Sequence, residues 1–176
     1  MNVPRRATGR QTRADCIEML STVLAHAPGS VRGTAVFMLH SERRAGGDAD
    51  AAWCLDDHVL ADVLQRLAAA APTWHRLLHG ERGEFIVIAQ GLVDGGAVLG
   101  SAARLVHAYD DALREADLPV VCDVSIGIAF SPQHGGRAEA LLSAAESGLR
   151  DAMRTARGGK RRGDAPYESQ CDSSCG

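Results

Sequence analysis

Apolar residues in this chain recur at two alternating spacings, and that alternation limits the folds that the chain can adopt. Segments with apolar residues three and four positions apart are typical of amphipathic helices, whereas short apolar runs are typical of buried strands. The helices are expected at residues 12–27, 55–71, 95–116 and 137–156, and the strands at residues 33–40, 74–80, 84–90 and 119–130. The order helix, strand, helix, hairpin, helix, strand, helix predicts an α/β fold with one central sheet.

The composition argues against membrane and nucleic-acid partners. The net charge is −3 and the pI is about 6.1, so no overall charge draws the chain to nucleic acid or to an anionic bilayer. A basic run at residues 157–162 (RGGKRR) is short, and such runs are usually solvated. No apolar run approaches the ~18–20 residues that span a bilayer, and no apolar segment follows the basic N-terminus as it would in a signal peptide. We therefore expect a cytoplasmic protein.

The cysteines and histidines suggest neither a disulfide framework nor a metal site. The chain has 5 cysteines, and an odd number without an export signal argues against a disulfide framework. Cys171 and Cys175 lie in a polar C-terminal tail, where a flexible segment is favoured over a metal or redox site. The 7 histidines are scattered and lack the spacing of metal-binding helices. We expect a flexible N-terminus at residues 1–6 and a disordered tail at residues 163–176.

Four short motifs occur in an order and at distances that match one known family. They are residues 7–13 (ATGRQTR), residues 81–85 (ERGEF), residues 124–129 (VSIGIA) and residues 144–149 (AAESGL). With these motifs the chain resembles the GGDEF family of diguanylate cyclase domains over about residues 5–162. The resemblance implies a GGDEF or nucleotide-cyclase-like fold, with a central mixed β-sheet flanked by helices, at residues 7–162.

Active members of this family condense two GTP molecules into cyclic di-GMP between two antiparallel protomers. The reaction needs Mg²⁺, held by carboxylates, to neutralise the triphosphate and to activate the attacking hydroxyl. The resemblance places the first metal-binding aspartate on His40, a second acidic residue on Glu42, and the acidic third residue of the turn on Gly83. Imidazole is a poor Mg²⁺ ligand. The main metal carboxylates are therefore expected to be lost, with no cofactor retained.

Other positions of the turn and the last helix also depart from the family pattern. The two glycines of the turn fall on Glu81 and Arg82, whose side chains occupy space that a phosphate would need. Glu84 and Phe85 are retained, and Phe85 is also suited to open a core strand. The phosphate-contacting lysine falls on Met153.

Three charged residues remain as candidate nucleotide contacts. Arg157 matches an arginine of the last helix, although a cation near a helix C-terminus is also favoured by the helix dipole. Asp48 and Asp57 fall on the guanine-reading positions, and a carboxylate can accept two hydrogen bonds from a guanine edge. For Asp57, a charge at a helix N-terminus is the favoured explanation.

These departures predict a degenerate, catalytically inactive GGDEF-like domain without catalytic or metal-ligating residues. Its expected role is a regulatory protein-interaction module, whose partner is an enzyme or effector of cyclic di-GMP signalling. One alternative is a GTP sensor without turnover that uses Asp48 and Asp57. A second alternative is an active cyclase with His40 and Glu42 as unusual ligands. The sequence leaves open the partner's identity and the oligomeric state.

Overall fold

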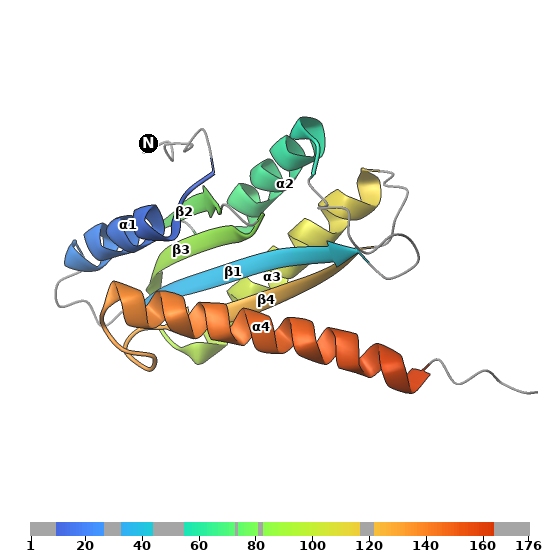
Figure 1. Ribbon diagram of the computed structural model, residues 1–176. Coiled ribbons are helices and arrows are strands. Elements are labelled where there is room, and N and C mark those ends of the chain that lie inside the picture. The colour runs from blue at the N-terminus through green and yellow to red at the C-terminus, as the bar shows by residue number, and fades with distance from the viewer. Residues whose placement is uncertain are drawn as a thin grey trace, which may run out of the picture.

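A computed structural model describes residues 10–26, 33–43, 55–72, 74–80, 83–116 and 122–163. Four helices and four strands alternate along them in the order predicted from the apolar spacing (Figure 1). The helices are α1 (Arg13–Ala25), α2 (Asp57–Ala70), α3 (Gly95–Glu115) and α4 (Ala138–Gly163). The strands are β1 (Gly33–Arg43), β2 (Trp74–His79), β3 (Phe85–Leu92) and β4 (Cys122–Phe130).

The strands form one sheet in the order β2-β3-β1-β4, and every pair of neighbours is antiparallel. The expectation of a mixed sheet is therefore wrong for the described strands. The reason is that each crossover helix connects two strands that are not adjacent in the sheet. Helix α2 connects β1 to β2, which have β3 between them, and α3 connects β3 to β4, which have β1 between them. The parallel pairing that is described is an isolated bridge between Gln11 and Gly80.

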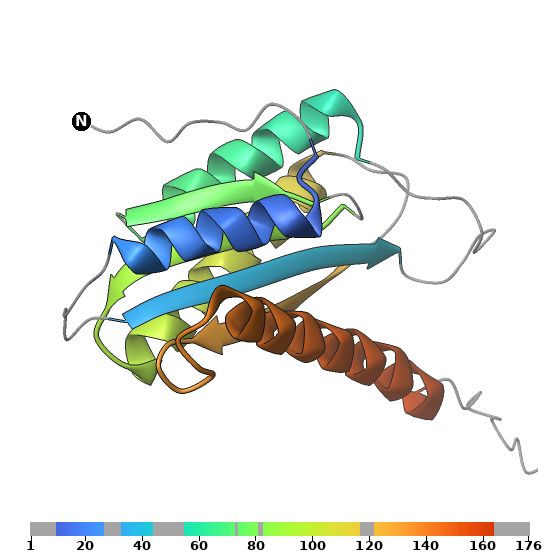
Figure 2. The same ribbon diagram turned by 60° about the vertical axis from the view of Figure 1, so that its left-hand side comes forward.

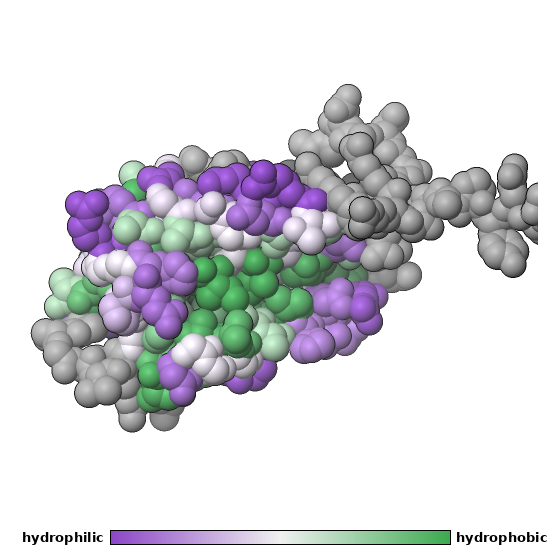
Figure 3. Space-filling model, turned by 90° about the horizontal axis from the view of Figure 1, so that it is seen from below, coloured by the Kyte–Doolittle hydropathy of each residue, from purple (hydrophilic) through white to green (hydrophobic). Residues whose placement is uncertain are grey.

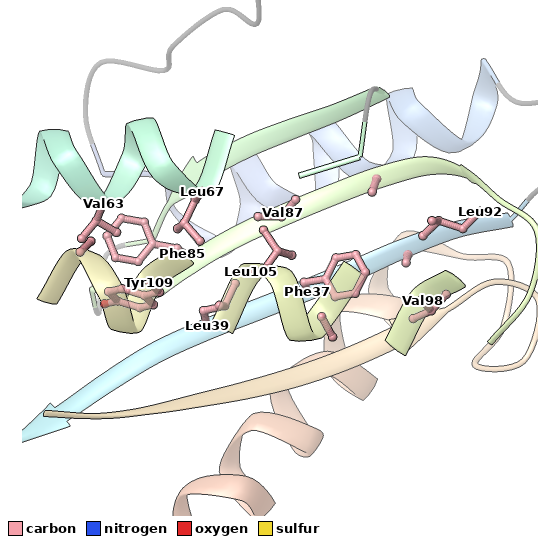
Figure 4. Close-up of a cluster of buried hydrophobic side chains, with 14 of the residues drawn as sticks. Phe37, Leu39, Val63, Leu67, Phe85, Val87, Leu92, Val98, Leu105 and Tyr109 are labelled. Carbon is pink, nitrogen blue, oxygen red and sulfur yellow. The ribbon is translucent and has the colours of Figure 1, made fainter. Parts of the chain in front are cut away.

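Helices cover both faces of the sheet, with α2 and α3 on one face and α1 and α4 on the other (Figure 2). Alternation along β1 divides the core into two clusters, because successive side chains of a strand point to opposite faces. Phe37 and Leu39 pack toward α2 and α3, where Phe85, Leu105 and Tyr109 are also buried (Figure 4). Val36 and Met38 pack toward α1 and α4 on the other face.

Side-chain caps fix where three of the helices begin. Thr12 and Asp15 form a reciprocal capping box at the start of α1. Asp56 accepts hydrogen bonds from the amides of His58 and Val59 at the start of α2, and Asp94 caps α3 in a similar way.

A close approach between a helix and the sheet lies at Gly127, in the motif of residues 124–129. A Cβ atom built there would lie 2.1 Å from the carbonyl oxygen of Ala145 and 2.4 Å from the amide nitrogen of Leu149. Only glycine leaves room for the backbone of α4 at this distance. The glycine in this motif is therefore required by the packing of α4 on β4.

Three elements run beyond their predicted ends, and β3 does so by two residues, to Leu92. β1 continues to Arg43 because Ser41, Glu42 and Arg43 pair with β4, a contact that the local sequence does not reveal. α4 continues from residue 156 to Gly163. The predicted flexible N-terminus at residues 1–6 lies outside the described residues. The disordered tail predicted at residues 163–176 starts one residue too early, because Gly163 is the last residue of α4, and residues 164–176 lie outside the described residues. Within the described residues, every helix falls short of the combined length and hydropathy needed to cross a bilayer.

Candidate functional site

The segment that resembles the family's signature turn connects β2 to β3. The amide of Gly80 donates to the carbonyl of Glu84 at 2.7 Å, and the amide of Gly83 donates to the carbonyl of Gly80 at 3.1 Å. Gly83 has a φ of +81°, in the left-handed region that glycine adopts without strain. Gly83 therefore allows the backbone conformation of the turn, and it supplies no carboxylate. Glu81 and Arg82 lie outside the described residues.

The first motif lies against this turn. The amide of Gln11 donates to the carbonyl of His79 at 2.7 Å, next to the bridge between Gln11 and Gly80. Two residues later, Arg13 reaches α4, where its Nε lies 2.9 Å from a carboxylate oxygen of Glu146. The guanidinium also donates to the Ser143 hydroxyl at 3.1 Å. The structure thus brings together three of the motifs that carry the family resemblance: residues 7–13, the turn, and residues 144–149.

The register between β1 and β3 places His40 beside the turn. Leu39 pairs with Phe85, so the next residue of β1, His40, lies at the same end of the sheet as Glu84. His40 continues the alternation of Val36 and Met38 and therefore faces α1 and α4. The two positions that the resemblance assigns to metal carboxylates, His40 and Gly83, thus lie at one end of neighbouring strands.

The donors at this end do not fit Mg²⁺, which requires an octahedron of oxygen ligands. His40 offers a nitrogen, Gly83 has no side chain, and the Glu84 side chain packs over Gly80. A Cβ atom at Gly80 would lie 2.7 Å from the Glu84 Cδ, and Glu84 is only 8% exposed. Among the described residues, histidines, cysteines and acidic residues form no group of three or more that could hold a metal ion.

The Glu84 carboxylate lies on the α1 side of the sheet, close to Cys16. Burial, and secondarily the negative charge of Glu84, raise the pKa of the Cys16 thiol to about 11. The thiol is therefore protonated at neutral pH and is a weak nucleophile. Cys16 acts as a small apolar residue of the core.

An aromatic series connects the turn to β1 on the opposite face of the sheet. The His79 ring stacks on Phe85 with centroids 4.9 Å apart, and Phe85 meets the edge of Tyr109 at 5.1 Å. The Tyr109 hydroxyl lies 2.9 Å from the Ser41 hydroxyl in a buried hydrogen bond, and burial raises the pKa of Tyr109. Burial, and then the nearby Arg10 charge, lower the pKa of His79. Sequence reasoning missed this series, and the only local signal was the position of His79 just before the turn.

The candidate nucleotide contacts are only partly described. Asp57 is exposed at the first position of α2, where the neighbouring Asp56 provides the cap. Asp48 lies outside the described residues. Arg157 belongs to α4, but its side chain lies outside the described ones. Met153, at the lysine position, packs against the apolar cluster beneath α4.

Comparison with known proteins identifies this arrangement. A family model described as "Diguanylate cyclase, GGDEF domain" matches residues 55–159. No curated protein sequence matches the chain.

Solved structures share the fold at low sequence identity. A sensory box/GGDEF family protein from Caulobacter crescentus is 22% identical over 84% of this chain and 96% of its own, with a TM-score of 0.61. The GGDEF domain of TpbB (YfiN) from Pseudomonas aeruginosa is 21% identical over 87% of this chain and 90% of its own, with a TM-score of 0.63. The diguanylate cyclase SiaD from Pseudomonas aeruginosa, in complex with its activator SiaC, is 15% identical over 88% of this chain and 59% of its own, with a TM-score of 0.59.

Proposed function

Because the chain belongs to the GGDEF family of diguanylate cyclase domains, we propose that it is a catalytically inactive member of that family. Its role is that of a cytoplasmic, regulatory protein-interaction module in cyclic di-GMP signalling. The donor set beside the turn carries this proposal, because His40 and Gly83 stand where the family resemblance places metal carboxylates.

Electrostatics explains why this donor set matters for turnover. Phosphoryl transfer depends on groups that neutralise charge developing on the phosphate oxygens. Loss of one such group commonly lowers the rate by ~10²–10³. With the carboxylates at positions 40 and 83 replaced together, we expect no measurable synthesis of cyclic di-GMP.

A protein partner is supported by the behaviour of a structural neighbour. SiaD was solved in complex with its protein activator SiaC, so one protein that contains this fold is regulated through protein contact. We infer that this chain binds an enzyme or effector of cyclic di-GMP signalling. It has no partner among nucleic acids or membranes in this proposal.

One observation favours a GTP sensor as a second candidate. Asp56 caps α2, which leaves the exposed Asp57 carboxylate at the position that reads guanine in the family. A sensor would bind GTP through Asp57 and Asp48 without turnover. The third candidate is a cyclase with His40 and Glu42 as metal ligands. The poor fit of the donors beside the turn to Mg²⁺ argues against it.

Calorimetric titration of GTP with Mg²⁺ and an assay for cyclic di-GMP separate the three candidates. The interaction module gives neither heat nor product. Saturable heat without product would favour the GTP sensor over the interaction module. In that case Asp57→Ala should weaken GTP binding, and Asp111→Ala, on the exposed side of α3, should not. Product that disappears in His40→Ala would show that the domain is an active cyclase, and the proposal would be wrong.

A further inference from the structure

The last residue of β4 turns its backbone groups away from the rest of the sheet. Strand β4 lies at one end of the strand order, and β1 is the described strand that pairs with it. The amide of Ser131 donates to the carbonyl of Thr34 in β1 at 2.9 Å, so this amide faces β1. Because successive amides of a strand point in opposite directions, the amide and carbonyl of Phe130 face away from β1. These two groups need partners from outside the sheet.

The side of the molecule along β4 is largely apolar. Val124, Ile126 and Ile128 of this strand are half-buried. Figure 3 shows apolar residues gathered in the middle of this side of the molecule. The partners of the Phe130 backbone come instead from the loop that connects β4 to α4.

His134 in this loop bonds to both backbone groups of Phe130. The amide of His134 donates to the Phe130 carbonyl at 2.9 Å, and the Phe130 amide donates to the ring Nδ1 of His134 at 3.0 Å. A backbone amide can only donate, so the Nδ1 atom that it meets is the acceptor. The ring is therefore neutral, with its proton on Nε2. We call this pair of hydrogen bonds the His134 clasp.

The loop around the His134 clasp is fixed by its own contacts. The amide of Gly135 donates to the carbonyl of Pro132 at 2.9 Å and closes a turn. Gly135 has a φ of +101°, which glycine adopts without strain. A Cβ atom built on Gly33 would lie 2.4 Å from the carbonyl oxygen of Ser131, so the start of β1 packs against the loop. These contacts hold the imidazole at the end of the strand.

The charges on the elements around the loop are of both signs. The start of β1 carries no charge. The charged residues at the starts of the two helices that pack on β4 are Asp94 of α3 and Arg137 and Glu139 of α4. Asp94 accepts a hydrogen bond from the amide of Ala97 in its own helix. A proton on His134 therefore acts chiefly through the hydrogen bond of its own ring.

A proton on the ring removes the acceptor for the Phe130 amide. Histidine takes up a proton between about pH 8 and pH 5 in many proteins, and both of its ring nitrogens are then donors. His134 is exposed, so solvent reaches its side chain. Two N–H groups would then face each other where the Phe130 amide now lies 3.0 Å from Nδ1. The charged ring can turn to the Phe130 carbonyl, which is 3.3 Å away, but the amide is left without its partner.

We propose that the His134 clasp is a proton-sensitive switch, which closes the end of β4 at neutral pH and opens it in mild acid. In the closed state, neutral His134 takes the place of a neighbouring strand at Phe130. In the open state, the Phe130 amide is exposed to water. Because the loop leads directly into α4, the clasp makes the attachment of that helix to β4 responsive to pH. This inference goes beyond the interaction role proposed above and does not depend on it.

Hydrogen exchange of the full chain, followed by NMR, tests the switch. The readout is the protection factor of the Phe130 amide, which is the ratio of its intrinsic to its measured exchange rate at each pH. We expect it to fall by about five- to tenfold between pH 8 and pH 5, with the same midpoint as the titration of the His134 ring. The neighbouring Ser131 amide, which bonds to a backbone carbonyl, should change by less than about twofold. Constant protection of Phe130, or an equal fall at Ser131, would overturn the proposal.

Substitutions separate the effect of the proton from the geometry of the loop. An asparagine oxygen accepts an amide proton as Nδ1 does but does not titrate, so His134→Asn should give equal protection of Phe130 at both ends of the pH range. His134→Ala has no acceptor and should give low protection throughout. His107→Asn, at an exposed position of α3, is the matched control and should keep the fall of the unaltered chain.

A fall in protection that persists in His134→Asn would show that another group takes up the proton, and the proposal would be wrong. A fall that disappears in His107→Asn would also contradict the assignment to His134. The cyclase and GTP assays are independent of these measurements. An active enzyme with a pH-dependent Phe130 amide would therefore contradict only the proposed inactivity.

Discussion

Gly127 and Gly148 lie on the two sides of the same contact, yet they have different requirements. A Cβ atom at Gly127 would lie within 2.1 Å of the backbone of α4, whereas one at Gly148 would lie 3.5 Å from Gly127, an ordinary contact. Strand and helix therefore approach closely because of the glycine in the strand. The glycine in the helix is replaceable.

Substitution of the two glycines by alanine should have opposite effects on stability. We expect Gly127→Ala to lower the free energy of unfolding by about 1–3 kcal/mol or more, because α4 must move away from β4. Gly148→Ala should raise it by up to about 1 kcal/mol, because alanine favours the helix. Urea unfolding of both variants measures the difference. Equal effects at the two positions would mean that the contact is not as close as described.

Titration of His79 should make the fold less stable in mild acid. Folding lowers the pKa of His79 through burial and the Arg10 charge, so the unfolded chain binds the proton more readily. Its contribution is full above pH ~6.5 and declines as the pH falls below that value. In His79→Phe, which keeps an aromatic ring against Phe85, the loss between pH 7.5 and pH 5.5 should be smaller. Urea unfolding at both pH values tests this, and equal losses in the two proteins would contradict it.

At the scale of elements, the start of α1 sets the position of the first motif. The capping box of Thr12 and Asp15 fixes the first turn, directly after the residues that lie against the signature turn. Hydrogen bonds from the amide and hydroxyl of Thr12 lower the pKa of Asp15. This cap therefore connects a local sequence signal to the geometry of the site.

Removal of the cap should destabilise the protein measurably. We expect Thr12→Ala to lower the free energy of unfolding by about 1 kcal/mol, because the amide of Asp15 loses its acceptor. Ser21→Ala, an exposed position in the middle of α1, is the matched control and should change it by less than about 0.5 kcal/mol. Thermal unfolding of the three proteins compares the values, and a Thr12→Ala variant as stable as Ser21→Ala would show that the cap contributes nothing.

Local sequence was sufficient to predict the helices and strands, but it was insufficient to predict how the strands pair. Every helix and strand was predicted near its observed place, because apolar spacing and caps act within a few residues. The antiparallel order was not, because it depends on which strand each crossover helix skips. At the site, the resemblance located His40 and the turn, but the contact between Tyr109 and Ser41 joins distant segments and left no local signal.

For the whole molecule, we expect the packed unit to end with α4. Removal of residues 164–176 should leave the free energy of unfolding unchanged within about 0.5 kcal/mol. A second truncation that ends at Ser143 removes Ala145 and Leu149 from the core and should prevent folding. Circular dichroism and thermal unfolding distinguish the two. A large loss of stability in the first truncation would show that the tail packs against the domain.

The position of β1 between β3 and β4 has a consequence for synthesis on the ribosome. Arg43 leaves the ribosome roughly 80 residues before its partner Cys122, a delay of roughly 4–16 s at ~5–20 residues per second. During that interval the backbone N–H and C=O groups of β1 that later pair with β4 are open to pairing with other nascent chains. One of the two inner strands of this sheet thus keeps an unpaired edge until β4 has been made.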